Sequence, residues 1–158
     1  YDLIDHIDTR IKEPKSIVKK MEKKKYDKTY LNLIEKINDI AGIRIVCTLK
    51  DDIFFIRDLV KQIPDIHILK EKDYVTNPKE SGYSSYHMIV EVPVKLTQKT
   101  IYVKCEIQIR TLAMDFWASF EHKVKYKTKN DVNPKMSKEL VNCAKMINKF
   151  DTKMINYK

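Results

Sequence analysis

The residues of this 158-residue chain that could do chemistry are two carboxylates set among many cations. Asp39 stands where a predicted helix gives way to a strand, and Glu106 stands on the polar side of another predicted strand. Carboxylate oxygens at such positions suit Mg²⁺ that is shared with substrate phosphates. Phosphoryl-type transfer needs positioning, metal and positive charge more than covalent help from the protein. The pattern therefore suggests transfer between nucleotides.

Other common chemistries lack their sequence patterns. The four histidines have no zinc-site spacing, and the chain has no HExxH, Walker loop, GxGxxG or GxSxG motif. No cysteine and histidine are close enough in sequence to suggest a thiol nucleophile. Metalloprotease, P-loop, dinucleotide-binding and serine-hydrolase classes are therefore disfavoured.

Residues 74–87 form the second chemically suggestive stretch. The chain has only two glycines, and Gly82 lies here between Lys79 and Tyr83. Glycine permits positive φ or close approach of a ligand, and Asn77-Pro78 is a turn signal. We expect a loop that carries a cation and an aromatic ring, followed by a strand bearing His87. Such a loop could hold a nucleotide, and a side chain at position 82 should crowd the nucleotide or the turn.

The composition agrees with an anionic partner. Hydrophobic content is 43%, charged content 34% and net charge +9, which favours nucleotides, nucleic acid or an acidic membrane surface. We expect most of the lysines to lie on solvated helix faces, and the run at 23–25 to be a solvated face and not a site. The three cysteines are scattered, with Cys47 and Cys105 at apolar strand positions, as in a reducing compartment.

We expect a cytoplasmic protein. No apolar run approaches 18 residues, and no signal peptide opens the chain. Because the sequence begins at tyrosine, we also expect residues upstream of it.

Hydrophobic periodicity predicts the elements that must position these groups. Helices are expected at 14–25, 30–38, 51–63, 111–127 and 134–158, with weak helical character at 2–11. Strands are expected at 43–49, 66–74, 84–94 and 101–110, with a hairpin loop at 97–100. Residues 101–110 alternate apolar and polar without exception, so one face should be buried. We expect one domain over 1–158, without internal repeats.

The helices carry apolar stripes that should face a core. The predicted core positions are Leu31, Ile34 and Ile37; Ile53, Ile56, Leu59, Val60 and Ile63; Ala113, Phe116, Trp117, Phe120 and Val124; and Met136, Leu140, Cys143, Ala144, Ile147, Phe150 and Met154. The last stripe could pack on the domain or on another subunit. If the strands pair in register, Arg44, His87 and Glu106 with Gln108 should share one polar sheet face.

Five ordered blocks resemble a known family. They are Arg10-x-Lys12-x-x-x-Ser16, Asp39-Ile-Ala-Gly-x-Arg44, Tyr74-x-x-Asn-Pro-Lys79-x-x-Gly-Tyr83-x-Ser-x-His87, Glu106-x-Gln108-x-Arg110-Thr and Trp117-Ala-x-x-Glu121-His122. Together they resemble the (p)ppGpp synthetase domain of RelA/SpoT homologues, most closely the single-domain small alarmone synthetases. The match spans roughly residues 10–127, with the C-terminal helix of about 134–158 beyond it.

The resemblance implies an α+β fold, a nucleotidyltransferase-like mixed β-sheet of about five strands flanked by helices. It implies GTP pyrophosphokinase activity, in which the β,γ-diphosphate of ATP moves to the 3′-hydroxyl of GTP or GDP and leaves AMP. It also implies a homo-oligomer, often a tetramer, with alarmone or RNA as a possible regulator. Neither DNA nor a membrane is expected as a partner.

The resemblance also implies roles for matched residues. The ATP side would use Arg10, Lys12, Ser16 and Arg44. Asp39 would bind Mg²⁺, and Glu106 would help bind the metal and activate the acceptor hydroxyl. The acceptor side would use Lys79, Tyr83, His87, Gln108 and Asp115, with Tyr83 stacking on guanine, while Arg110, Glu121 and His122 would support the site. Asp115 departs from the pattern, because some relatives carry asparagine there.

Two alternatives remain open from the sequence. One is a toxin-type relative that pyrophosphorylates tRNA or an adenine nucleotide. The other is a non-catalytic basic module that binds RNA or a regulator, against which the presence of both Asp39 and Glu106 argues.

Overall fold

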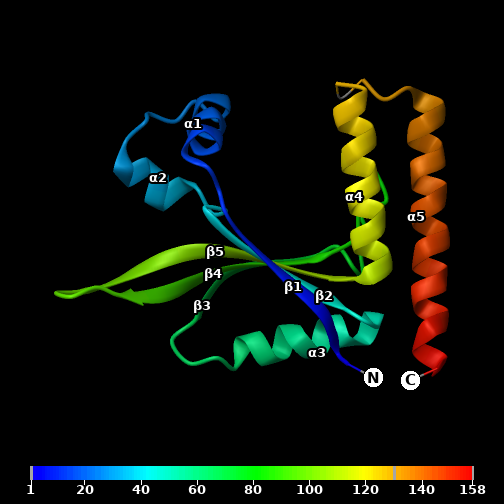
Figure 1. The fold of residues 1–158 in the computed structure, drawn as a ribbon, viewed down its shortest axis with the longest axis horizontal. Helices are drawn as coiled ribbons and strands as arrows, with labels where there is room; N and C mark the ends of the chain where they lie inside the picture. Colours follow the sequence, from blue (N-terminus) through cyan, green and yellow to red (C-terminus); the bar gives the residue numbers. More distant parts are fainter. Residues whose placement is uncertain (1, 130, 158) are drawn as a thin grey trace.

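The computed structural model describes residues 2–129 and 131–157. Figure 1 shows a twisted sheet with helices packed around it. The strands are β1 (Ile4–Ile11), β2 (Ala41–Cys47), β3 (His67–Asp73), β4 (Tyr86–Lys95) and β5 (Thr100–Thr111). The helices are α1 (Pro14–Lys23), α2 (Tyr30–Lys36), α3 (Lys50–Lys61), α4 (Leu112–Lys127) and α5 (Pro134–Met154), followed by a 3₁₀ turn at Ile155–Tyr157.

The sheet has the mixed pairing that the family resemblance implied. Its strand order is β1-β2-β5-β4-β3; β2 and β5 are parallel, and the other neighbours are antiparallel. In register, Gln108 on β5 pairs with Arg44 on β2 and with His87 on β4. The α+β fold class and the expected shared polar face are both confirmed.

The other sheet face is the main core. The alternation of β5 places Cys105, Ile107 and Ile109 on this face, and all three are buried. Helix α3 covers the face, as Figure 1 shows, with Ile53 and Ile56 buried among these side chains. Because α3 and the strands seal this side, the polar side chains of the opposite face are left to form the site.

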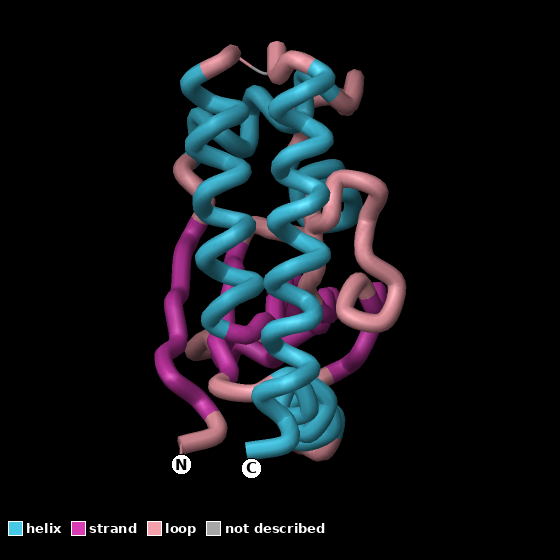
Figure 2. Tube along the Cα trace, turned by 90° about the vertical axis from the view of Figure 1, so that its right-hand side faces the viewer, coloured by secondary structure: helices cyan, strands magenta, loops and turns pink. Residues whose placement is uncertain are grey.

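Helices α4 and α5 stand side by side as an antiparallel pair in both views (Figures 1 and 2). Thr111 caps α4 by accepting a hydrogen bond from Met114 N at 3.1 Å. Trp117 is buried, as expected, and its Nε1 donates to the Leu140 carbonyl of α5 at 3.0 Å. A second, smaller core of Trp117, Ala118, Leu140 and Ala144 joins the two helices.

The expectation of weak helical character at residues 2–11 is wrong. This segment is strand β1, paired antiparallel with β2 from Ile4 to Ile11. Isoleucine and threonine favour strands, and pairing at the sheet edge satisfies the backbone even though most of the side chains are exposed. Tertiary pairing therefore overrides the weak local signal.

Several predicted core residues are exposed. On α4, Phe116 and Phe120 are 69% and 50% exposed and stack on each other instead of facing the core. The others are Leu31, Ile34, Leu59, Ile63, Met136, Cys143 and Phe150. Each lies on an apolar stripe that is wider than the surface its helix buries, because each helix packs against its neighbours through one side only.

Two observations bear on the expected cellular compartment, namely the state of the cysteines and the hydropathy of the helices. Cys47 and Cys105 are buried free thiols, as the sequence predicts. Within the described residues, no helix combines the length and apolar character needed to cross a bilayer.

Candidate active site

Three central strands bring four predicted site residues onto one face. Arg44, His87 and Gln108 are direct neighbours in the register, and Glu106 lies two residues before Gln108 on the same side of β5. Period-two alternation of the strands places them together opposite the α3 core. The sequence-based prediction that these strands share a polar face is met residue by residue.

Asp39 precedes β2 and is held by two lysines. Lys12 Nζ donates to Oδ2 at 2.6 Å, and Lys20 Nζ lies 2.8 Å from Oδ1. Burial alone raises the pKa of Asp39, but the two ammonium groups outweigh it, so the pKa is lowered. Asp39 is therefore ionised at neutral pH.

Glu106 is the second carboxylate and is bound from two sides. His87 Nδ1 lies 3.3 Å from Oε1, and Gln108 Nε2 donates to Oε2 at 3.3 Å. The hydrogen bond from His87 lowers the pKa of Glu106 most strongly; burial and the nearby charge of Asp39 oppose it. The net direction is downward, so Glu106 is also ionised at neutral pH.

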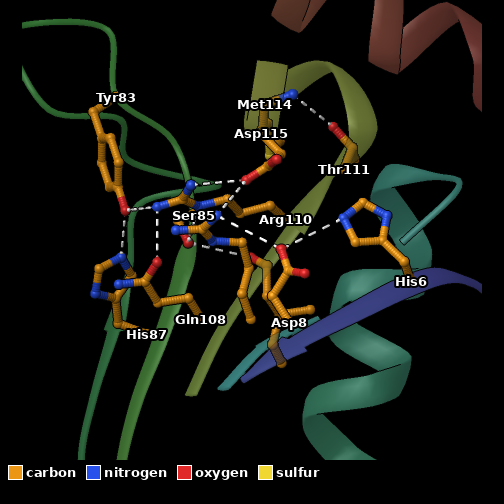
Figure 3. A network of polar contacts seen from close by, with 12 residues as sticks. His6, Asp8, Tyr83, Ser85, His87, Gln108, Arg110, Thr111, Met114 and Asp115 are labelled. Carbon is orange, nitrogen blue, oxygen red and sulfur yellow. Dashed lines mark hydrogen bonds and ion pairs between the residues drawn. The ribbon is translucent and has the colours of Figure 1, made fainter. Parts of the chain in front are cut away.

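Arg110 is the hub of the polar network in Figure 3. Its Nη2 donates to the Tyr83 hydroxyl at 2.6 Å and to Gln108 Oε1 at 2.8 Å. Its Nε donates to Ser85 Oγ at 3.3 Å, and its Nη1 donates to Asp115 Oδ1 at 3.1 Å. The side chain is 6% exposed, so a full positive charge is fixed below the surface of the site.

The loop before β4 presents an aromatic cluster. Tyr83 Oη lies 2.9 Å from His87 Nε2, and the Tyr74 ring meets both of these rings edge to face. Lys79 Nζ is 4.9 Å from the centroid of the Tyr83 ring, and Arg110 Cζ is 5.1 Å from it. Lys79 is exposed and can leave the ring, whereas Arg110 is buried and stays.

Gly82 of this loop has φ +90° and faces the helix pair, not the sheet. A Cβ there would clash with Ala144 Cβ on α5 and lie 3.6 Å from Trp117. The expected crowding is therefore against α5, and the loop is fixed by packing of its rear side.

Arg44 faces the same region from β2. Its Nη1 lies 3.5 Å from Asp115 Oδ1 and 3.9 Å from Asp8 Oδ2. Its Nε is buried and has no hydrogen-bond partner among the described residues. A buried donor left in this way costs free energy unless a ligand or water completes it.

The polar face opens into adjoining cavities. One of about 390 Å³ is lined by Asp39, Glu106 and His87 together with five lysines: Lys20, Lys24, Lys36, Lys70 and Lys72. A second, of about 410 Å³, is lined by Arg10, Arg44, Tyr83 and Arg110 with one side of α4. A third, of about 110 Å³, contains Arg10, Arg44 and Glu106 and so links the other two. The arrangement is two cation-rich cavities with a small third cavity, containing Glu106, between them.

Comparison with known proteins identifies the family of the chain. The family model for the region found in RelA/SpoT proteins matches residues 9–131. The chain belongs to the RelA/SpoT family. It is 46% identical over 155 residues to GTP pyrophosphokinase YwaC of Bacillus subtilis, covering 98% of this chain and 74% of that protein.

Solved structures of the RelA/SpoT family share the fold closely. Small alarmone synthetase 2 from B. subtilis superimposes with a TM-score of 0.90 at 44% identity, covering 99% of this chain and 82% of that one. Small alarmone synthetase 1 from the same organism, in complex with its product pppGpp, gives 0.88 at 35% identity, covering 98% and 78%.

The remaining predicted site residues are less central. Glu121 and His122 line the 410 Å³ cavity from α4, and Glu121 pairs with Lys125 at 2.5 Å, as its helical spacing predicted. Ser16 is exposed near the start of α1 and lines none of the three cavities. Lys79 is also absent from those linings, and its ammonium lies 4.7 Å from the centroid of the Tyr74 ring and 4.9 Å from that of the Tyr83 ring.

Sequence reasoning missed several residues of this site. Lys20 belongs to none of the five sequence blocks, although it falls four residues after Ser16 on the same helix face. Ser85 is completely buried and accepts from Arg110, but no local pattern distinguishes it from other strand serines. Lys70 and Lys72 come from edge strand β3, and only the sheet topology brings them to Glu106.

Proposed function

We propose that this chain is a GTP pyrophosphokinase that transfers the β,γ-diphosphate of ATP to the 3′-hydroxyl of GTP or GDP, producing (p)ppGpp and AMP. The observation that carries the proposal is the pair of ionised carboxylates, Asp39 and Glu106, in one lysine-rich cavity that adjoins an aromatic loop. The relative YwaC is named a GTP pyrophosphokinase, and small alarmone synthetase 1 is named in complex with its product pppGpp. We treat residues 1–158 as one domain, with the core at about 10–127.

Arg10, Lys12, Ser16 and Arg44 would hold ATP. Arg10 and Arg44 flank the small linking cavity, and the unpartnered Nε of Arg44 provides a donor for the nucleotide. Lys12 and Lys20 lie at Asp39, where phosphate charge would gather. Lysine and arginine stabilise a triphosphate and the charge that develops on transfer.

The residues fit Mg²⁺. Within the described residues, no group of three or more histidine, cysteine, aspartate or glutamate side chains is arranged to hold a metal ion. Mg²⁺ is typically bound by one or two carboxylates plus substrate phosphates, and Asp39 and Glu106 face one cavity as ionised oxygen donors. When bound, Mg²⁺ would neutralise phosphate charge and polarise the bond to be broken. Asp39 and Glu106 would hold it.

Glu106 would also orient the acceptor 3′-hydroxyl and take its proton. The acceptor oxygen forms a bond to the β-phosphorus of ATP as the bond from that phosphorus to the bridging α,β-oxygen breaks, and AMP departs with that oxygen. A carboxylate with a lowered pKa is a weak base, so orientation is the larger part of its role. His87 and Gln108 fix both of its oxygens in place.

The acceptor would bind at the aromatic loop. Guanine would stack on Tyr83 after Lys79 leaves the ring, and Lys79 would then be available for the acceptor phosphates. Tyr83 is held by Arg110 at its hydroxyl, so the ring is presented in a fixed orientation. His87, Gln108 and Asp115 would complete the acceptor side, while Arg110, Glu121 and His122 would support it.

The direct test is a product assay. Purified protein with Mg²⁺, γ-³²P-ATP and either GTP or GDP should yield AMP and labelled guanosine pentaphosphate or tetraphosphate, respectively, resolved by anion-exchange chromatography. Label appearing in added tRNA but not in nucleotide would support the toxin-type alternative instead. Intact nucleotide binding with no labelled product would refute the proposed reaction.

Glu106→Gln is the matched chemical test. The amide keeps the side-chain shape and removes the charge, so turnover should fall to background while ATP binding, measured by calorimetry without turnover, persists. Turnover within tenfold of the parent protein would exclude Glu106 as the central carboxylate.

We further propose a cytoplasmic homo-oligomer, a tetramer by family resemblance, with alarmone or RNA as a possible regulator. The exposed, stacked Phe116 and Phe120 on α4 support a protein-protein contact, since large apolar surface favours burial. Light scattering after size exclusion measures this directly. A monomer at all micromolar concentrations would contradict it.

A further inference from the structure

We propose that Asp115 is a positioning residue that acts through Arg110 on both the acceptor platform and Glu106, and is not a ligand of the guanine base. The inference rests on the proposed function and assigns a different role to a residue that the family resemblance places beside the acceptor nucleoside. It is carried by the contacts of the Asp115 carboxylate, whose Oδ1 already serves two arginines.

The first step is the charge of Arg110. Its guanidinium is almost fully buried, and Asp115 is the one carboxylate that forms an ion pair with it within the described part of the chain. A buried cation without a counter-charge is strongly unfavourable, and removal of one partner leaves the other uncompensated. Asp115 therefore keeps Arg110 in its place.

The second step is the reach of Arg110 to Glu106 by two routes. In one, Arg110 donates to Gln108 Oε1, and Gln108 Nε2 donates to Glu106. In the other, Arg110 donates to the Tyr83 hydroxyl, which pairs with His87 Nε2, and His87 Nδ1 faces Glu106. Figure 3 shows Arg110 between Tyr83, Gln108 and Asp115, where both routes begin.

The hydrogen-bond donors and acceptors along the second route are compatible with one another. Because the Tyr83 hydroxyl oxygen accepts from Arg110, its own proton is free to be donated to His87 Nε2. The proton of a neutral His87 then sits on Nδ1, which can donate to Glu106 Oε1. Arg110 thus orients both neighbours of the reacting carboxylate, and Tyr83 as well.

The third step concerns the base. Oδ1 of Asp115 is 3.1 Å from Arg110 Nη1 and 3.5 Å from Arg44 Nη1, so this oxygen is committed to cations. An asparagine at this position could still bond a base edge but would carry no counter-charge. The chemistry of aspartate at position 115 is therefore matched to the two arginines.

Asp115→Asn separates the two roles because it is isosteric and uncharged. We expect kcat/KM for GDP to fall roughly 10- to 100-fold, as the loss of a hydrogen bond to a charged group produces, with kcat lowered as well as acceptor KM raised. Asp115→Glu keeps the charge and should retain more activity than Asp115→Asn. Asp5→Asn, which removes a carboxylate that pairs with the exposed side chain of His6 on β1, is the charge-matched control and should match the parent protein.

Inosine diphosphate distinguishes positioning from base recognition, because it lacks the 2-amino group of guanine. If Asp115 acts through Arg110, Asp115→Asn weakens GDP and inosine diphosphate by the same factor. If Asp115 accepts a hydrogen bond from the 2-amino group of guanine, the ratio of the two acceptors changes, and a shift in that ratio of tenfold or more overturns the inference.

A double-mutant cycle tests the route. When Arg110→Met is already present, adding Asp115→Asn should lower kcat/KM by less than a further threefold. If the two residues acted independently, the effects of the two substitutions on kcat/KM would multiply. Multiplicative effects, or an Asp115→Glu as inactive as Asp115→Asn with both folded by circular dichroism, would overturn the inference. If the parent protein makes no product, the proposed function fails; if it turns over normally and Asp115→Asn matches it, only the inference fails.

Discussion

Gly82→Ala should destabilise the protein through the rear side of the acceptor loop. Position 82 has φ +90°, a conformation that alanine rarely adopts, and a Cβ there would clash with Ala144 of α5. Gly42, the other glycine, provides a matched control. A Cβ at position 42 would meet Arg10 only at 3.5 Å, which is ordinary contact.

The magnitude follows from two separate contributions. The left-handed backbone costs an alanine about 1–2 kcal/mol, and overpacking against α5 adds about 1–3 kcal/mol. The free energy of unfolding should therefore fall by roughly 2–5 kcal/mol, which for a chain of this size lowers Tm by roughly 4–20 °C. Gly42→Ala should be neutral or stabilising by about 0.5–1 kcal/mol, because glycine weakens a strand interior.

Urea unfolding of Gly82→Ala, Ala144→Gly and the double variant isolates the packing contribution. Ala144→Gly relieves the clash but not the backbone strain, so the cycle should show a favourable coupling of about 1–3 kcal/mol. Acceptor KM should rise in Gly82→Ala and recover partly in the double variant, since Lys79 and Tyr83 flank the glycine. Additive effects would show that Gly82 is not pressed against Ala144.

Three further outcomes are expected. Tyr83→Ala should weaken the acceptor by roughly 1–3 kcal/mol if guanine stacks there, and an unchanged acceptor KM would count against stacking. His87→Ala removes the hydrogen bond that most lowers the pKa of Glu106, so the acid limb of the pH profile of kcat/KM should move to higher pH. If the acid limb does not move, it does not report the ionisation of Glu106. Burial raises the pKa of Asp151, which accepts from Thr111 Oγ1 at 2.6 Å, so its contribution to stability is present below about pH 3.9 and lost as pH rises through its folded pKa. As the pH rises from 3 to 7, the unfolding free energy of Asp151→Asn should therefore increase relative to that of the parent protein. A difference between the two proteins that does not change with pH would contradict this.

Much of the sheet could be predicted because its pattern is local. The uninterrupted alternation of residues 101–110 identified β5 and its polar face, and the in-register meeting of Arg44, His87 and Gln108 followed from pairing. Strand β1 could not be predicted in this way, since its side chains are mostly exposed and only pairing with β2 defines it. Edge strands carry little periodic signal when neither face is buried.

Which residues of each apolar helix stripe are buried, and which charged residue organises the site, could not be predicted from the sequence. Phe116 and Phe120 fit a core stripe, but α4 already buries Trp117 and Ala118 against α5, which leaves the phenylalanines outside. Arg110 was expected only as a supporting residue on a polar strand face. Its central role depends on Tyr83, Gln108 and Asp115 converging from three elements, and no sequence spacing encodes that convergence.

The residues proposed to act in the reaction and those proposed to bind the substrates lie on different parts of the fold. Glu106, Gln108 and Arg110 lie on β5, the central strand, which is paired on both sides and packed under α3. Arg10 lies on the exposed edge strand β1, and Lys79 lies on the loop before β4 and is exposed. Local opening is easiest at edges and loops and hardest in central strands. Substrate entry can therefore move the binding residues while the carboxylate and its hydrogen bonds stay fixed, so substitutions at the edge should alter KM before they alter kcat.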